Sequence, residues 1–250
     1  MFREEISPRK TPFFQFTPLN DLPYFIHGTS TRKTDAALGL NDSSLSEETA
    51  RAYLKGMGVG ADVTVGLIRQ VHSSVCRDLA ARSSNPAIPE EADGLIVNRS
   101  GVIGMIRTAD CLPIIAIDAA ARIVGLFHAG WRGTRDRIVE RGLRQMLQAG
   151  ADPVRVVCAI GPSVRACCYE VGEEVLRGFA EAGHELEPLI QGSRLDLVEA
   201  NVRQMERSGI STVYDSGLCT VCRSDLFYSY RRDKTERRMW TFAGFLPAAG

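Results

Sequence analysis

Residues 122–161 read RIVGLFHAGWRGTRDRIVERGLRQMLQAGADPVRVVCAIG, and they decide the fold class. The apolar run 122–130 predicts a β-strand. The spacing of apolar residues over 134–150 predicts a helix that ends near a glycine. A second apolar run over 154–161 predicts another strand, so the stretch forms a β-α-β-like unit. We therefore expect an α/β protein.

The remaining elements extend this prediction on both sides. Apolar runs predict further strands at 63–72, 94–100, 101–106 and 112–118. Helical periodicity appears at 46–58, 172–183 and 195–209. Strands 94–100 and 101–106 meet at Ser100-Gly101, which predicts a tight turn, and 80–91 is rich in Ser, Pro and Ala, which predicts a loop. Hairpins combined with β-α-β units predict a mixed sheet rather than a doubly wound parallel one.

Composition narrows the class of protein. A chain of 250 residues suits one domain, 1–250. Its 30 basic and 30 acidic residues cancel, so no nucleic acid or membrane surface is an expected partner. The N-terminus lacks the apolar stretch of a signal peptide. Seven cysteines, an odd number, fit reduced thiols, metal ligands or a catalytic thiol in a cytoplasmic protein.

Three predicted strands lead to residues that can bind a metal ion. His72 closes the run 63–72, Cys111 interrupts the run 101–118, and His128 lies near the end of 122–130. Two imidazoles and one thiolate suit zinc and leave a fourth position open, the arrangement of catalytic zinc sites. Their spacing matches no zinc finger, so the fold must bring them together. Histidines that only satisfy hydrogen bonds and a cysteine packed in the core explain the same residues.

The segment after His128 suits an anion. Gly130 and Gly133 flank Trp131-Arg132, and Thr134 stands where the N-cap of helix 134–150 is expected. Backbone N–H groups at a helix N-terminus bind phosphate, and Arg132 could add a guanidinium group. A capped helix with a surface arginine is the alternative.

Other residues carry weaker signals. Asp93 and Glu170 could be general acid/base groups or caps, and His27 and Arg32 share a polar loop that could reach a ligand. Cys219 and Cys222 have zinc-ribbon spacing without a second such pair, so packing is the default interpretation. The same default applies to Cys167-Cys168, because adjacent cysteines resist both a disulfide and joint chelation.

Blocks along the chain resemble a known family. They include FIHGTSTR (25–32), RQVHS (69–73), ADGLIV (92–97), TADCLPI (108–114) and GLFHAGWRGT (125–134). Together they look like the signature blocks of the laccase-domain (YfiH-type) family, over about 25–245. Two departures occur near the expected site: Arg165-Ala166 replaces the family's usual Gly-Pro, and Ser73 replaces a glycine.

The resemblance implies fold, metal and activity. It implies a two-layered β-structure with helices outside, in one domain with mixed sheets. It carries the metal ligands onto His72, Cys111 and His128, with zinc or copper as the metal. It implies phosphorolysis of the purine nucleosides adenosine, inosine and 5′-methylthioadenosine, with phosphate as co-substrate, and deamination of adenosine. Either a monomer or a homodimer is compatible with it.

Three alternatives remain open. The family's older label, copper-dependent polyphenol oxidase, conflicts with a chain of four histidines, because a four-copper site needs about ten imidazoles. A Cys–His hydrolase could use Cys111 as nucleophile and His72 or His128 as base, on peptides of cell-wall precursors. A non-catalytic metal-binding module is the third. Arg32, Arg132 and Thr134 are the expected phosphate contacts of the favoured nucleoside enzyme.

Overall fold

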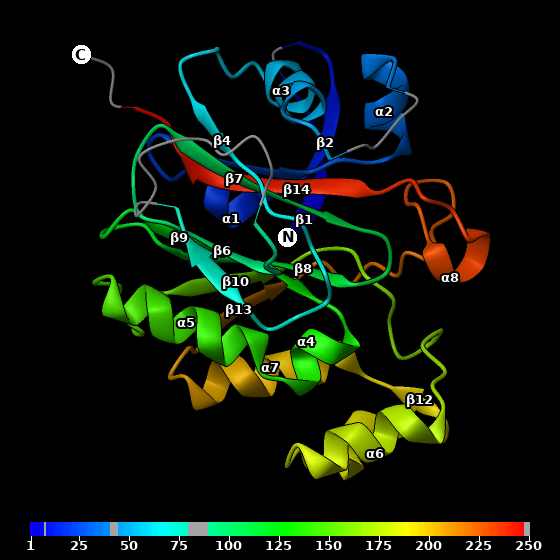
Figure 1. Ribbon diagram of the computed structural model, residues 1–250. Helices are drawn as coiled ribbons and strands as arrows, with labels where there is room; N and C mark the ends of the chain where they lie inside the picture. Colours follow the sequence, from blue (N-terminus) through cyan, green and yellow to red (C-terminus); the bar gives the residue numbers. More distant parts are fainter. Residues whose placement is uncertain (8, 41–44, 80–89, 248–250) are drawn as a thin grey trace.

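Two six-stranded β-sheets lie face to face in the computed structural model, which describes residues 1–7, 9–40, 45–79 and 90–247 (Figure 1). The first sheet has the order β1-β2-β3-β14-β7-β4, with strands at Phe2–Ile6, Pro12–Phe16, Phe25–Thr29, Met239–Phe245, Val102–Thr108 and Thr64–Gly66. The second has the order β13-β10-β8-β9-β6-β5, with strands at Thr212–Asp215, Val157–Ile160, Leu112–Asp118, Ile123–Ala129, Gly94–Val97 and Cys76–Asp78. A small ribbon pairs β11 (Ile190–Gln191) with β12 (Arg194–Leu195).

The central strands are apolar on both faces because both faces are covered. In β8, Ile115 and Ile117 enter the core between the two sheets, whereas Ile114 and Ala116 face the helices on the other side. All seven residues of β8 are buried. This double burial explains why the strand reads as a continuous apolar run instead of an alternating one.

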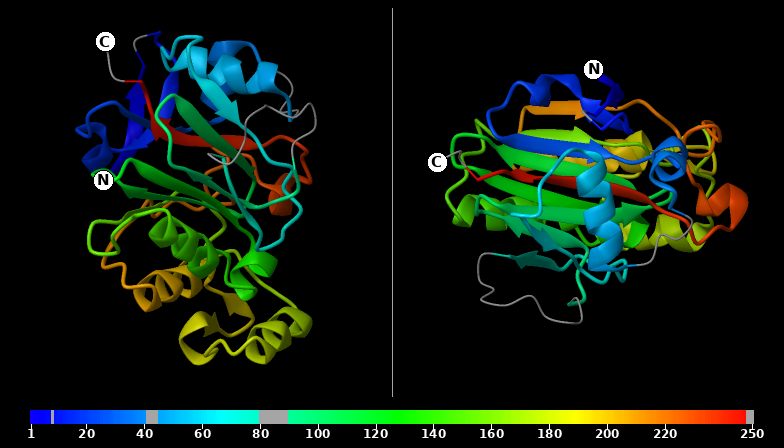
Figure 2. Two further views of the ribbon diagram at one scale, coloured as in Figure 1. Left: turned by 60° about the vertical axis from the view of Figure 1, so that its left-hand side comes forward. Right: turned by 90° about the horizontal axis from the view of Figure 1, so that it is seen from above.

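Helices cover the outer face of each sheet. The longer helices are α3 (Glu47–Gly56), α5 (Ile138–Gln148), α6 (Glu173–Glu181) and α7 (Leu197–Arg207). Short helices are α1 (Thr17–Asn20), α2 (Arg32–Leu38), α4 (Trp131–Arg135), α8 (Tyr230–Asp233) and the 3-10 turn Glu187–Leu189. Figures 1 and 2 show α5 and α7 against the second sheet and α3 above the first, so the layers run helix, sheet, sheet, helix.

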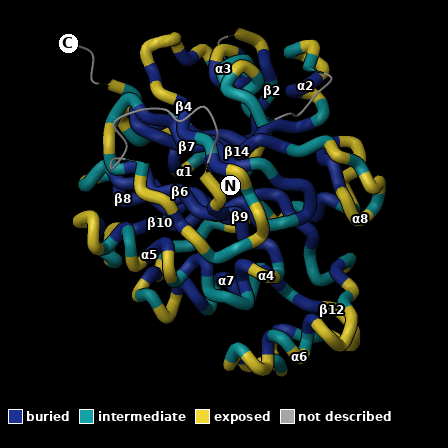
Figure 3. The backbone as a smooth tube through the Cα atoms, in the orientation of Figure 1, coloured by how far each residue is buried: buried dark blue, intermediate teal, exposed yellow. Residues whose placement is uncertain are grey.

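Burial follows these layers. Tyr53 and Leu54 of α3 pack with Trp240 and Phe242 on the outer face of the first sheet. Leu143 of α5 joins the corresponding cluster on the second sheet. The backbone is buried along the sheets and exposed along much of α6 (Figure 3). No helix in the described part of the chain is both long and apolar enough to cross a membrane.

The structure confirms the predicted fold class. Parallel pairs (β4 with β7, β5 with β6, β10 with β13) occur in sheets that are otherwise antiparallel, so both sheets are mixed. Strand β9, helices α4 and α5, and strand β10 form the expected β-α-β-like unit around the intervening β8. Helices α3, α6 and α7 confirm the predictions at 46–58, 172–183 and 195–209.

Three local predictions need correction. The strand predicted at 63–72 ends at Gly66. The turn at Ser100-Gly101 makes no hairpin, because β6 and β7 belong to different sheets. The helix predicted at 134–150 is two helices, since Arg137 adopts a left-handed φ of 62° between α4 and α5. Most of the predicted loop at 80–91 lies outside the described residues.

Two of the links between the sheets position the site. The chain passes from β4 in the first sheet to β5 in the second, and again from β7 to β8. The first link contains His72 and the second contains Cys111. Side chains from both sheets can therefore meet at one edge of the sandwich.

Candidate functional site

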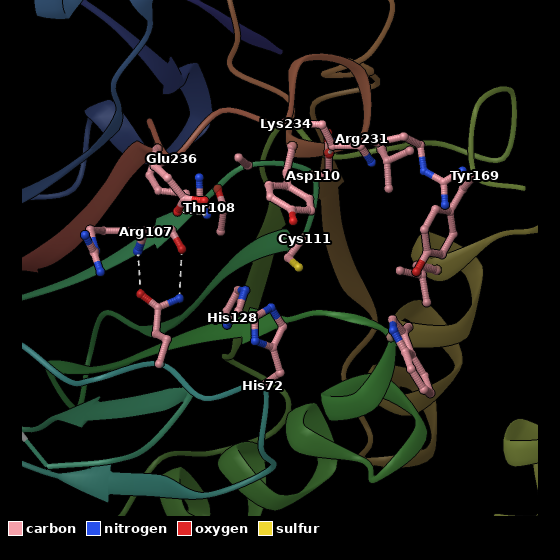
Figure 4. A pocket seen from close by; sticks show the side chains of 17 residues that line it. His72, Arg107, Thr108, Asp110, Cys111, His128, Tyr169, Arg231, Lys234 and Glu236 are labelled. Carbon is pink, nitrogen blue, oxygen red and sulfur yellow. Dashed lines mark hydrogen bonds and ion pairs between the residues drawn. The ribbon is translucent and has the colours of Figure 1, made fainter. Parts of the chain in front are cut away.

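His72, Cys111 and His128 converge, although His72 lies six residues beyond the end of β4 and not at the end of a strand as expected. One ligand atom of each lies within 4.8 Å of the others. His128 comes from β9, and its partner in the adjacent strand is Pro113, two residues after Cys111. Figure 4 shows the two histidine rings beside each other, next to the Cys111 sulfur. The ring centroids of the histidines are 4.9 Å apart, in an edge arrangement.

The carboxylate of Asp93 orients two of the three residues. His128 Nδ1 lies 2.7 Å from Asp93 Oδ1, and both side chains are buried. Backbone N–H groups of Val71, His72 and Ser73 donate to the same carboxylate, and so does the Ser73 hydroxyl. Asp93 therefore directs the other nitrogen of His128, Nε2, toward Cys111 and holds the backbone turn that presents His72.

Local backbone geometry keeps the three groups close. His72 has a φ of 60°, in the left-handed region that non-glycine residues rarely adopt. A Cβ on Gly130 would lie 2.9 Å from Cys111 Sγ and 3.3 Å from the His72 ring. Glycine is therefore required at position 130 because a larger residue would displace the thiol or the imidazole.

Electrostatics favour an ionised thiol. Burial acts to raise the pKa of Cys111, but the His128 ring and then the His72 ring outweigh burial and lower the pKa to about 6. Burial acts to lower the pKa of His128, but the Cys111 thiolate and the Asp93 carboxylate raise it to about 9. The opposite directions of these pKa shifts favour a thiolate beside an imidazolium in the metal-free site, and a metal cation could replace the imidazolium proton.

The three groups open into a cavity of about 860 Å³. Aromatic side chains on its wall are Trp131, Tyr169 and Tyr230, and cationic ones are Arg107, Arg231, Lys234 and Arg238. The hydroxyl of Thr108, also on the wall, is buried without a hydrogen-bond partner. Such a lining can hold a flat ring and an anion beside the His–Cys–His groups.

Asp110 connects three segments of the cavity wall and received no role in the sequence analysis, although it lies in the block TADCLPI beside Cys111. Thr220 Oγ1 donates to one carboxylate oxygen at 2.7 Å, and the Arg231 backbone N–H donates to the other at 2.7 Å. The Val164 N–H donates to the Asp110 carbonyl. A left-handed φ of 88° at a buried aspartate beside Cys111 is unusual, but it becomes visible only in the structure.

Gln70 is a second residue that sequence reasoning missed. Its side-chain amide exchanges two hydrogen bonds of 2.8 Å with the backbone of Arg107 in β7 (Figure 4). These bonds secure the link that carries His72 to the first sheet. The position close to His72 in the block RQVHS was the available signal.

Two predicted substrate contacts lie elsewhere. His27 is buried in β3, where its Nε2 accepts a hydrogen bond from the Phe16 N–H, and burial lowers its pKa to about 4. Arg32 pairs with Asp233 at 2.8 Å and covers the Tyr228 ring. It lines a separate hollow of about 540 Å³. Neither residue is among those that line the large cavity.

The predicted anion site at the start of helix 134–150 also needs correction. Gly130 is the N-cap, and Thr134 lies inside α4, where its buried hydroxyl accepts a hydrogen bond from the Asn201 amide. Arg132 is exposed and stacks over Trp131, with its guanidinium carbon 4.2 Å from the ring centroid. Neither Thr134 nor Arg132 lines the cavity.

The two carboxylates singled out in the sequence have different surroundings. Asp93 is fully buried beneath His128. Burial acts to raise its pKa, but hydrogen bonding to His128 lowers it. Glu170 is exposed, accepts a hydrogen bond from Ser193, and does not line the cavity. The structure thus places Asp93 beside a site residue and Glu170 apart from it.

Known proteins resemble this chain in sequence and in fold. Residues 27–245 match the model of a family described as multi-copper polyphenol oxidoreductase laccase. A purine nucleoside phosphorylase of Deinococcus radiodurans is 41% identical over 62% of this chain, and this match spans 61% of that protein. Adenosine deaminase RL5, from an unknown prokaryotic organism, is 32% identical over 77% of this chain and 79% of its own. The crystal structure of Bacillus licheniformis hypothetical protein YfiH matches with a TM-score of 0.79 at 23% identity, over 98% of each chain.

Proposed function

The chain belongs to the multi-copper polyphenol oxidoreductase laccase family, and we propose that it is a zinc-dependent purine nucleoside phosphorylase that also deaminates adenosine. Adenosine, inosine and 5′-methylthioadenosine are its proposed substrates. Relatives named purine nucleoside phosphorylase and adenosine deaminase support nucleoside chemistry. The observation that carries the proposal is the convergence of His72, Cys111 and His128 at a cavity large enough for a nucleoside.

The donor set fits zinc. Two imidazole nitrogens and one thiolate are ordinary zinc ligands, and the side of the group that faces the cavity leaves room for a fourth ligand. The other two histidines of the chain are engaged elsewhere: His27 with Phe16, and His184 with the Arg135 carbonyl. The chain therefore lacks the imidazoles that a four-copper oxidase needs. When bound, zinc would supply a Lewis acid and lower the pKa of a water molecule.

Other residues of the protein would orient the ligands and bind the substrate. Asp93 fixes the tautomer and orientation of His128. Tyr169 and Trp131 offer rings on which a purine can stack, and the buried Thr108 hydroxyl offers a hydrogen bond to the substrate. Arg231 and Lys234 replace Arg32 and Arg132 as the proposed contacts of phosphate, because they line the cavity.

Both reactions balance without a redox step. In phosphorolysis a phosphate oxygen forms a bond to C1′ of the sugar as the C1′–N9 bond breaks, and the purine leaves with a proton. In deamination water adds at C6 of adenosine and ammonia leaves. The positive charge of Arg231 and Lys234 stabilises the bound phosphate in the first reaction only.

A second candidate is a Cys–His hydrolase that cleaves an amide. The alignment of Cys111, His128 and Asp93 supports it, because a thiol, an imidazole and a carboxylate in series can act as nucleophile, base and orienting group. A nucleophilic thiol needs one imidazole, however, whereas here two approach the sulfur.

Metal removal separates the two candidates. We expect the zinc-loaded protein to release hypoxanthine and ribose 1-phosphate from inosine only when phosphate is present, and to form some inosine from adenosine. Removal of zinc with a chelator should stop both reactions, and added zinc should restore them. Amide hydrolysis by metal-free protein, together with inert nucleosides, would replace this proposal with the hydrolase.

A further inference from the structure

Four cysteines outside the His–Cys–His group lie together in a second cluster. Cys167 and Cys168 follow strand β10, and Cys219 and Cys222 occupy the loop between β13 and α8. All four sulfur atoms lie within 4.8 Å of one another. Packing was the expectation for each pair taken separately, and the fold joins the two pairs and leaves Cys167 and Cys222 exposed.

The spacing of the sulfur atoms suits one tetrahedral ion. Sulfur atoms of Cys168 and Cys222 are 3.5 Å apart, and those of Cys167 and Cys222 are 3.9 Å apart. Four thiolates about 2.3 Å from a zinc ion lie about 3.8 Å from each other. A disulfide requires about 2.05 Å between two sulfurs and pairs only two of them. The observed arrangement therefore resembles a ligand set more than a pair of oxidisable dithiols.

Cys158 provides a contrast to the clustered thiols. It is a fully buried thiol of β10, packed among the apolar side chains of the core, and it belongs to neither group of potential ligands. The four clustered sulfurs differ from it because they lie together, and Cys167 and Cys222 are exposed.

Two arginine side chains hold the cysteine-bearing loops in place. The Arg232 guanidinium donates to the Thr220 and Val221 carbonyls and pairs with Asp233 at 2.6 Å. Arg165 pairs with Asp215 at 2.6 Å and donates to the Leu218 carbonyl. These contacts fix the backbone on either side of Cys219 and Cys222 before any ion binds.

We propose that Cys167, Cys168, Cys219 and Cys222 bind one zinc ion in a closed, structural site. As each sulfur binds the ion, its thiol proton passes to solvent, so no oxidant or reductant is required. All four positions of the ion are filled by protein, which leaves none for substrate. This proposal does not rest on the proposed nucleoside activity.

The location of the cluster gives the ion a structural task. Cys168 precedes Tyr169 on the cavity wall, and Thr220, between the other two cysteines, donates to Asp110 beside Cys111. The backbones of Ser163 and Cys219 also pair in an isolated parallel β-bridge between the two loops. An ion at the cluster fixes both loops and, through Tyr169 and Asp110, the shape of the cavity.

Metal counting tests the second site. Protein purified under reducing conditions with zinc present should contain about two zinc ions per chain, and Cys167→Ser/Cys222→Ser should contain about one. Cys158→Ala, which removes a core thiol that belongs to neither cluster, should keep about two. Equal zinc contents in the wild type and the double variant, both folded by circular dichroism, would overturn the proposal.

Cobalt substitution keeps the test decisive if the double variant does not fold. Cys111→Ala retains all four clustered thiols, so it should bind about one Co²⁺ with the intense sulfur-to-cobalt bands of tetrathiolate ligation. Its four clustered thiols should resist alkylation until a chelator is added. A Cys111→Ala protein that binds no cobalt, or whose clustered thiols react at once, contradicts a site built from four cysteines.

Discussion

The two clusters of metal-ligating side chains differ in openness and in how they are held. His72, Cys111 and His128 supply three mixed ligands, and they face a cavity of about 860 Å³. The four-cysteine cluster supplies four ligands of one kind from two loops near the surface. Three ligands leave a position for substrate or water, whereas four close the coordination shell. Ligand number and access would therefore distinguish the proposed catalytic site from the proposed structural one.

The largest expected effect comes from removing a ligand of the open site. Cys111→Ala should lower kcat/KM for inosine by about 10³-fold or more, because a Lewis acid contributes several kcal/mol to the transition state. Steady-state kinetics with metal analysis measures both changes, and Cys158→Ala is the matched thiol control. If Cys111→Ala lost a zinc ion but kept phosphorolysis, both clusters would be structural, and the contrast between them would disappear.

A smaller effect on metal affinity and activity is expected when the open site keeps His72, Cys111 and His128 but loses the carboxylate that orients them. Asp93→Asn should reduce zinc affinity or activity about 10- to 100-fold, because the amide holds His128 Nδ1 and the turn at His72 less well. The zinc content of the four-cysteine cluster should not change. Competition with a fluorescent chelator resolves the two affinities, and equal weakening of both sites would indicate general unfolding instead.

Thiol titration tests the electrostatics of the open site in the absence of metal. In metal-free protein, the rate of Cys111 alkylation, followed on its own peptide by mass spectrometry, should rise with a midpoint near the pKa of about 6. The sign follows from the lowered pKa: the reactive thiolate predominates above this pKa, whereas an ordinary thiol ionises near about 8.5. His128→Gln should move the midpoint upward. An unchanged midpoint in that variant would remove the imidazole as its cause.

The smallest effect concerns the residue that replaces the family's usual glycine. Ser73→Ala removes one hydroxyl that donates to Asp93 at 2.8 Å, and other donors remain. We expect a loss of about 1 kcal/mol in the free energy of unfolding, measured by urea denaturation, with full zinc content. Loss of zinc from this variant would show that the hydroxyl is essential to the open site.

Residues in strands were the most predictable part of the molecule. The runs at 112–118 and 122–130 became β8 and β9, because strands buried on both faces must be continuously apolar. Prediction failed at 63–72 and at Ser100-Gly101. In both places a short strand ends and the chain passes from one sheet to the other. The local sequence indicates that the chain turns, but it does not indicate which sheet the next strand joins.

The candidate site divides in the same way. His72, Cys111 and His128 could be selected because each lies in or at the end of an apolar run, and the structure brings them together. Arg32 and Thr134 looked like phosphate contacts, yet one pairs with Asp233 and the other is buried against Asn201. A helix N-terminus was expected at Thr134, but α4 has its N-cap at Gly130, and the left-handed Arg137 separates α4 from α5.

The mixed α/β class and the members of the His–Cys–His group could be predicted from the chain alone, since burial patterns and ligand chemistry are local properties. Which groups meet depended on the folded molecule. Folding joined Cys167-Cys168 to Cys219 and Cys222, placed Asp110 between Thr220 and Arg231, and selected the cations that line the cavity. Contacts between residues far apart in the chain depend on how the two sheets pack, and no short stretch of sequence contains that information.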